Sequence, residues 1–357
     1  MFGTYRTILA LAVVLQHLIS IPMLGHYAVH GFFILSGYLM TYVMCNTYGY
    51  SVQGVKSFAV NRFLRLYPSY WGILAISMLA IAWFGESNSM EYREFIYIPD
   101  TFSQWLQNLS LIFPNIFPGQ ISPRISPPTW ALTIELIFYF FIAIGISKSK
   151  RATVTWFCIS LLYMTITHVY GMEYNYRYNI IFAGTLPFSL GAMIYHFYGN
   201  LRNQRLIDSS GKVIPILFTI LVLNSFISAV LYKLEISEFA FNVSFYLNYV
   251  LNASVIFMLI EGKVPILSRK LDKKIGDYSY PIYLMHWQAG FAASMLLWGE
   301  PIRGFNVQGF TSLLFALVIC LFLSTLIIRL IDHPIEKLRQ KVKFAQREKS
   351  LNAVSNN

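Results

Sequence analysis

The first apolar segment of the chain, residues 5–17, reads YRTILALAVVLQH and carries one arginine and one histidine in an otherwise almost entirely apolar run. Arg6 and His17 are eleven positions apart. On an α-helix this is about three turns, so both side chains leave the same face roughly 16 Å apart along the axis. Ionisable groups are rare in helices that span a bilayer, and they usually mark a pathway or a site. The spacing therefore predicts a polar wall along a membrane-spanning helix.

The composition of the whole chain agrees with a membrane environment. Of its 357 residues 56% are hydrophobic and only 12% are charged, which is too apolar for an ordinary soluble domain. Ten apolar windows have about the 20 residues that a helix needs to cross the hydrocarbon core. They cover residues 5–24, 28–47, 66–85, 129–147, 152–170, 178–198, 213–233, 239–260, 278–298 and 308–330. We therefore predict an all-α integral membrane protein, a bundle of ten transmembrane helices.

The basic residues predict the orientation of this bundle. If the N-terminus is inside, 22 of the 27 Lys and Arg residues fall on the inner side. The outer side then holds only Arg93, Arg124, Arg177, Lys233 and Arg303. In membrane proteins the cytoplasmic loops carry an excess of Lys and Arg. We therefore expect the inner side to be the cytoplasm and both termini to lie there. The net charge of +11 is thereby explained by topology, and we expect no nucleic acid partner.

The remaining parts of the chain form connections and a tail. We predict one transmembrane domain over residues 1–335, which includes a long outer loop at 86–128. Within that loop, residues 102–113 mix apolar and polar side chains, as in a segment that lies on the membrane surface. Residues 336–357 are expected to form a basic, polar cytoplasmic tail. The three cysteines lie in different apolar windows without metal-ligand spacing, so we expect no metal.

Three titratable residues are expected at similar depth in the bilayer. His17 lies about eleven residues above the inner surface, Glu135 about 9 Å below the outer surface, and His286 about 13 Å above the inner surface. Glu135 is the single acidic residue within a predicted span. A lone carboxylate in hydrocarbon either becomes neutral or finds a partner. We therefore expect Glu135 to contact one of the histidines.

This contact has two interpretations. It is either a structural hydrogen bond or ion pair that holds helices together, or a pair in which the carboxylate orients and polarises an imidazole for general-base catalysis. Because His17 shares its helix face with Arg6, we favour the catalytic interpretation, with His17 and Glu135 as the catalytic residues.

Two further arginines stand at the inner end of the third window. Arg62 and Arg65 are three residues apart and project from one helical face, which suits binding of phosphate oxygens by guanidinium groups. Alone, they would be ordinary basic residues of an inner loop. Together with Arg6 they predict a cationic opening from which a path leads to His17. A coenzyme A thioester has a matching shape, because its anionic nucleotide carries a long, thin arm that ends in the thioester.

These residues belong to a set of five motifs that follow one another in order along the chain. The motifs are Arg6 with His17, Phe32 to Tyr38, Arg62 with Arg65 before Leu66-Tyr67-Pro68, Trp130 to Glu135 with Tyr139, and Ser279-Tyr280 to His286-Trp287. In the order and content of these motifs, the chain resembles the membrane-bound acyltransferase family 3. The members of this family are bacterial integral membrane enzymes that modify surface sugars.

The resemblance implies a cytoplasmic acyl-CoA donor and transfer to a hydroxyl group. It implies that His17 is the catalytic histidine, that Arg6 is its motif partner, and that Arg62 and Arg65 are the paired arginines of the family. From these motifs we also expect Trp130, Tyr139 and His286 to contact the substrate.

We therefore predict an O-acyltransferase of the bacterial cytoplasmic membrane. It would move an acetyl group from acetyl-CoA to a sugar of a surface polysaccharide or lipid-linked glycan, with His17 as general base and Arg6, Arg62 and Arg65 holding the donor. His17 as a transiently acylated nucleophile remains open. A proton-coupled transporter or flippase is the alternative of another class. A scaffold subunit would leave the spacing of Arg6 and His17 without a purpose.

Overall fold

The computed structural model describes residues 1–119, 121–262, 264 and 267–343, and these residues contain helices and no strand. Each of the ten predicted windows contains one long helix. These helices are α1 (Gly3–Ile19), α2 (Leu24–Val43), α3 (Val52–Phe84), α6 (Thr129–Ala143), α7 (Lys150–Val169), α8 (Thr185–Leu201), α10 (Ser210–Leu234), α11 (Glu238–Glu261), α13 (Ser279–Trp298) and α14 (Val307–Ile327). The all-helical prediction is confirmed for the described residues.

Six helical segments among the described residues are long and apolar enough to cross a membrane. They are Leu24–Tyr48, Val52–Phe84, Lys150–Val169, Ser210–Leu234, Glu238–Glu261 and Val307–Lys343. α1 and α6 are apolar but shorter. α13 is long enough but carries polar side chains such as His286 and Gln288, and most of its length is buried by other helices. Of the helices that miss these criteria, α1 carries His17, α6 carries Glu135 and α13 carries His286.

The predicted starts of two helices differ most from the structure. α3 begins at Val52, well before its window, so Arg62 and Arg65 lie within a continuous helix. α8 begins at Thr185, because the preceding residues form two short 3₁₀ turns, Tyr174–Arg177 and Ile181–Gly184. There Ile181 donates its backbone N–H to the carbonyl of Asn115. This bond holds the segment against the outer loop, so its backbone does not continue α8.

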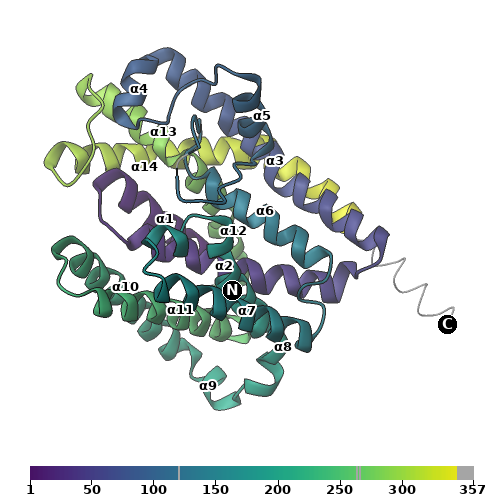
Figure 1. Cartoon of the computed structure of the whole chain (residues 1–357). Helices are drawn as coiled ribbons and strands as arrows, with labels where there is room; N and C mark the ends of the chain where they lie inside the picture. Colours follow the sequence, from purple (N-terminus) through teal and green to yellow (C-terminus); the bar gives the residue numbers. More distant parts are fainter. Residues whose placement is uncertain (120, 263, 265–266, 344–357) are drawn as a thin grey trace.

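α13 packs against α1, α3 and α14, and α2 packs between α1 and α8 (Figure 1). Two glycines allow α2 and α8 to touch through their backbones. A Cβ at Gly37 would lie 2.2 Å from the carbonyl oxygen of Phe188, and one at Gly191 would lie 2.0 Å from that of Ile34. Small residues of this kind let membrane helices approach closely. This contact fixes the face that α2 turns to the site.

The start of α1 is held by the short helix α12 (Arg269–Asp277). The carboxylate of Asp272 accepts hydrogen bonds from the backbone N–H groups of Gly3 and Thr4, at 3.0 and 2.9 Å. These N–H groups belong to the first turn of α1, where a negative charge also interacts favourably with the helix dipole. Thr7 adds a 2.8 Å hydrogen bond to the carbonyl of Ile275. Together these bonds fix the position of Arg6.

The outer loop folds back onto the bundle. It contains α4 (Glu86–Tyr92) and α5 (Phe102–Ser110), which lie together at the top of Figure 1. The apolar side chains of Phe102 and Leu106 on α5 are exposed, as expected for a segment at a membrane surface. Beyond α5, the backbone N–H of Arg124 donates to the carbonyl of Phe95 at 2.9 Å. The loop thereby carries Arg93 and Arg124 to the same region.

The last helix continues beyond α14 through Ile328–Asp332 to residue 343 and runs beside α3, at the right of Figure 1. The Asn61 amide donates to the carbonyl of Arg339, and the Arg339 guanidinium donates back to Asn61 Oδ1. The first part of the predicted tail is therefore helical and packed against α3. Residues 344–357 of that tail lie outside the described residues.

Candidate active site

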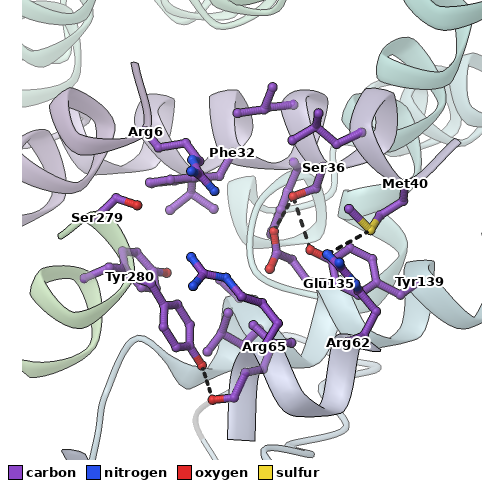
Figure 2. A pocket seen from close by; sticks show the side chains of 18 residues that line it. Arg6, Phe32, Ser36, Met40, Arg62, Arg65, Glu135, Tyr139, Ser279 and Tyr280 are labelled. Atoms are coloured by element: carbon purple, nitrogen blue, oxygen red, sulfur yellow. Dashed lines mark hydrogen bonds between the residues drawn. The ribbon is translucent and has the colours of Figure 1, made fainter. Parts of the chain in front are cut away.

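One cavity in the helix bundle contains the predicted arginines, and we call it the arginine cavity. It has a volume of about 130 Å³. Its polar lining includes Arg6 from α1, Ser36 from α2, Arg62 and Arg65 from α3, Glu135 and Tyr139 from α6, and Ser279, Tyr280 and Tyr283 from α13. Figure 2 shows the side chains of Arg6 and Arg65 directed into the same space. The predicted convergence of Arg6, Arg62 and Arg65 is therefore present in the fold.

The guanidinium groups of this cavity are held mostly by aromatic rings and neutral partners. Arg65 lies 5.8 Å above the ring of Tyr280, and Arg62 donates to Asn61 Oδ1 at 2.8 Å. The Nε atoms of Arg6 and Arg62 are buried and have no hydrogen-bond partner in the structure. The two ion pairs found among the described residues involve none of these arginines. The cavity therefore offers donors and positive charge to an anionic ligand.

Glu135 lies in the arginine cavity. The prediction that it contacts a histidine is wrong. Its Oε1 accepts a hydrogen bond from Ser36 Oγ at 2.5 Å, and Tyr139 OH is 3.5 Å from the same Ser36 oxygen. The predicted depth of Glu135, about 9 Å, is counted from Thr129, where the predicted window begins. Pro128 and Thr129 are instead buried, so α6 starts inside the protein and Glu135 lies farther in. Tyr139, one turn later, faces the same cavity.

The second cavity contains His17, and we call it the histidine cavity. It has a volume of about 350 Å³. Its lining includes Gln16 and His17 from α1, Arg93, Phe95 and Arg124 from the outer loop, Trp130 from α6, Tyr178, Trp287 from α13, and Arg303 from the loop before α14. His17 is half-buried at its wall, whereas His286 behind it is fully buried. Of the three residues expected to contact the substrate, Trp130 shares this cavity with His17, Tyr139 lines the arginine cavity, and His286 lines neither.

His17 and His286 form a hydrogen-bonded pair. His17 Nδ1 lies 2.8 Å from His286 Nε2, and His286 Nδ1 lies 2.8 Å from the carbonyl oxygen of Tyr283. A carbonyl only accepts, so the neutral His286 carries its proton on Nδ1 and has a lone pair on Nε2. That lone pair accepts the Nδ1 proton of His17. His17 Nε2 is then left unprotonated, on the ring edge opposite the buried partner, which is the state a base or nucleophile requires.

The two cavities share no lining residue, so the single predicted path from the arginines to His17 is divided in two. Two helices of the site run from one cavity to the other, α1 from Arg6 to His17 and α13 from Tyr283 to Trp287. The rings of Phe32 and Tyr283, with centroids 5.6 Å apart, lie at the end of the arginine cavity that faces the histidine cavity. These large side chains fill the space that helix spacing alone left open.

Several residues of the site were not assigned a role from the sequence. They are Ser36, Asp272, Trp287 and three arginines of the histidine cavity, Arg93, Arg124 and Arg303. Arg93 and Arg124 lie far apart within the outer loop and Arg303 lies in another loop, so no motif joins them. One signal was present: the outer side holds five basic residues, against the general trend, and three of them line this cavity.

The residues of both cavities fall within a known family. The family model described as an acyltransferase domain matches residues 4–329 of the 357. No curated protein and no solved structure matches the chain. The matched region begins at the first turn of α1 and ends after α14, so it contains every residue of the two cavities. The chain belongs to acyltransferase family 3 and is a multi-pass membrane acyltransferase.

Proposed function

We propose that the protein transfers an acetyl group from cytoplasmic acetyl-CoA to a sugar hydroxyl, with His17 as general base. The observation that carries the proposal is the chain of hydrogen bonds from the Tyr283 carbonyl through His286 to His17, which leaves His17 Nε2 free beside an open cavity. In serine hydrolases a carboxylate orients the catalytic histidine in a comparable way. Here a second histidine, itself oriented by a carbonyl, has that role.

The donor would bind with its phosphates in the arginine cavity. Arg6, Arg62 and Arg65 come from two helices and offer forked donors, which suit phosphate oxygens better than single ammonium groups. The pantetheine arm would extend along α1 toward His17, over roughly 16 Å. Binding at the arginines would thus position the thioester at the reacting groups, which lowers the entropic cost of the reaction.

The thioester has to pass the rings of Phe32 and Tyr283 to reach His17. We propose that these two side chains change rotamer when the donor is bound and so join the two cavities. Both rings line the arginine cavity, and the backbone carbonyl of Tyr283 is part of the hydrogen-bond chain to His17. Movement of the side chain alone would leave that carbonyl in place.

The chemical step balances without any further reactant. The acceptor hydroxyl oxygen attacks the thioester carbonyl carbon and passes its proton to His17 Nε2. The tetrahedral intermediate then expels the coenzyme A sulfur, and the imidazolium returns the proton to that sulfur. The products are an ester of the acceptor and free coenzyme A. A variant of this scheme, in which His17 Nε2 itself becomes acylated, uses the same geometry and predicts a labelled protein when the acceptor is absent.

We propose that ten helices span the bacterial cytoplasmic membrane, with both termini and the arginine cavity on the cytoplasmic side. The distribution of 22 basic residues on that side supports the orientation. The acceptor would be a surface polysaccharide or a lipid-linked glycan that enters the histidine cavity from the opposite side. The aromatic side chains of Trp130, Tyr178 and Trp287 in this cavity suit the apolar faces of a sugar ring.

The proposal is tested in membrane vesicles that contain the full-length protein. Acetyl-CoA labelled in the acetyl group is added to inside-out vesicles, whose cytoplasmic side faces the medium. The label in the glycan fraction is then measured. The proposal expects acetyl label in an alkali-labile ester and none with the variant His17→Ala at equal protein abundance. Full transfer by that variant would overturn the role of His17.

The alternative of a proton-coupled transporter or flippase has one observation in its favour. Two cavities that share no residue resemble the inner and outer vestibules of an alternating-access transporter. The match to an acyltransferase family favours transfer. Flux of a glycan across vesicles in the absence of acyl-CoA would support the transporter, and strict dependence of glycan modification on acyl-CoA would exclude it as the main activity.

A further inference from the structure

Three arginines lie in the same cavity as His17. Arg93 follows α4, Arg124 lies in the segment before α6, and Arg303 lies in the loop between α13 and α14. All three line the histidine cavity, which has a volume of about 350 Å³. Three separate chain segments thus bring positive charge to the place where the acceptor hydroxyl has to lie.

Aromatic rings hold these guanidinium groups in position. Arg93 and Arg124 lie 4.6 and 4.8 Å from the ring centre of Phe95, and Arg93 and Arg303 lie 5.5 and 5.3 Å from that of Trp287. A cation over an aromatic face is attracted to it, but the ring accepts few of the guanidinium hydrogens. The arginines are therefore oriented, with donors left for a ligand.

Among the described residues, no carboxylate lines the histidine cavity. Arg124 is 7% exposed, and the Nε atoms of Arg93 and Arg124 are buried without a hydrogen-bond partner. Burial, followed by the charge of Arg93, lowers the pKa of Arg124 to about 10, so Arg124 is still charged at neutral pH. Glu94, next to Arg93 in the chain, is exposed and outside the lining. A buried charge without a partner is costly, so the site is incomplete without an anion.

We propose that the acceptor of this acyltransferase is anionic, with a carboxylate or phosphate group held by Arg93, Arg124 and Arg303. This inference rests on the proposed function. The three guanidinium groups bind the oxyanion through charge-assisted hydrogen bonds, and the indole of Trp287, whose buried Nε1 has no partner, contacts the neighbouring sugar ring. The anchored sugar then presents a hydroxyl to His17 Nε2. Uncharged sugars lack the group that orients them there.

Binding is tested with pairs of related probes, of which one member is charged and the other is uncharged. The full-length protein in phosphatidylcholine nanodiscs is titrated by calorimetry with trigalacturonic acid and with its trimethyl ester, and in a second pair with glucose 1-phosphate and glucose. The inference expects the charged member of at least one pair to bind about tenfold tighter or more, the size of a charge-assisted hydrogen bond. Equal binding within both pairs would overturn it.

Variants locate the binding to this cavity. Arg303→Ala removes a guanidinium from a loop outside the helix bundle and is expected to abolish the preference for the charged probe, while Arg303→Lys keeps part of it. Lys233→Ala is the matched control, since Lys233 is another outer basic residue that is exposed and does not line the cavity. Loss of the preference in Lys233→Ala, or its retention in Arg303→Ala, would contradict the inference.

Two further arms separate this inference from other outcomes. Nanodiscs that contain phosphatidylglycerol test whether the anion is a lipid headgroup, because competition by the lipid against the charged probe would overturn the assignment to the acceptor. Acetyl transfer in vesicles tests the proposed function independently. Equal transfer to charged and uncharged acceptors would support the proposed acetyl transfer and contradict the anionic acceptor. Binding of the charged probe without any transfer would support the anion site and contradict the proposed acetyl transfer.

Discussion

His17 Nδ1 and His286 Nε2 lie 2.8 Å apart, and the two imidazole rings are nearly parallel, with centroids 5.1 Å apart and an angle of 13° between them. Because His286 is fully buried and donates to the Tyr283 carbonyl, it fixes the tautomer of His17 from the closed side of the site. The reactive nitrogen of His17 is thereby determined by a residue that does not line either cavity. Replacements of His17 and of His286 should therefore have different effects on the rate of transfer.

Replacement of His17 by alanine is expected to lower acetyl transfer by a factor of roughly 10² to 10⁴, the usual contribution of a general base. The measurement is the initial rate of label transfer from acetyl-CoA, normalised to protein abundance in the membrane. Donor binding, measured by equilibrium dialysis with labelled coenzyme A, should stay unchanged, because the arginine cavity does not include His17.

Replacement of His286 separates orientation from chemistry. His286→Ala removes the acceptor of the His17 Nδ1 proton and is expected to lower kcat about fivefold or more, since one hydrogen bond contributes about 1 kcal/mol. His286→Gln offers a side-chain oxygen as acceptor and should recover part of that loss. The KM for acetyl-CoA should not change. Equal rates for the alanine and glutamine variants would contradict a role in orienting His17.

Arg65→Ala is expected to raise the KM for acetyl-CoA about tenfold or more, because hydrogen bonds to charged groups contribute about 1.5–3 kcal/mol each. The KM of Arg65→Lys should lie between those of the unchanged protein and Arg65→Ala, since an ammonium group keeps the charge but cannot form the forked contact. The matched control is Lys56→Ala, a change at an exposed basic residue of the same helix that does not line the cavity. An unchanged KM in Arg65→Ala would remove Arg65 from the donor site.

Glu135→Gln tests the corrected position of Glu135. The amide can still accept from Ser36, but it removes a negative charge from the cavity that would hold the donor phosphates. We therefore expect a lower KM for acetyl-CoA and an unchanged pH profile of kcat. A changed pH profile would instead indicate that Glu135 acts on His17.

Gly3→Ala is expected to destabilise the protein by roughly 1–3 kcal/mol through overpacking. A Cβ at this position would lie 1.9 Å from the carbonyl oxygen of Asp272, so the first turn of α1 and with it Arg6 would have to move. Gly199→Ala is the matched control, because a Cβ at Gly199 in α8 meets nothing within 4 Å. Thermal unfolding of the solubilised variants measures the difference. Equal midpoints would show that α1 does not depend on this close contact.

The order of apolar and polar residues along the chain was enough to predict where the long helices lie. The ten windows each contain a long helix, because long apolar runs have to form helices in lipid to satisfy their backbone groups. The same order brought Arg6, Arg62 and Arg65 to one cavity, since the spacing within a helix determines the face on which side chains lie. It failed for the start of α8, where a hydrogen bond between Ile181 and Asn115 ends the helical pattern.

The helix pattern in the amino-acid sequence was sufficient to predict the all-helical fold and the cluster of Arg6, Arg62 and Arg65, because both depend on periodicity within single segments. The partner of His17, the position of Glu135 and the division into two cavities depended on the tertiary structure. Each of these is set by how far one helix slides along another, and that distance follows from packing contacts such as Gly3 against Asp272, which connect residues far apart in the chain.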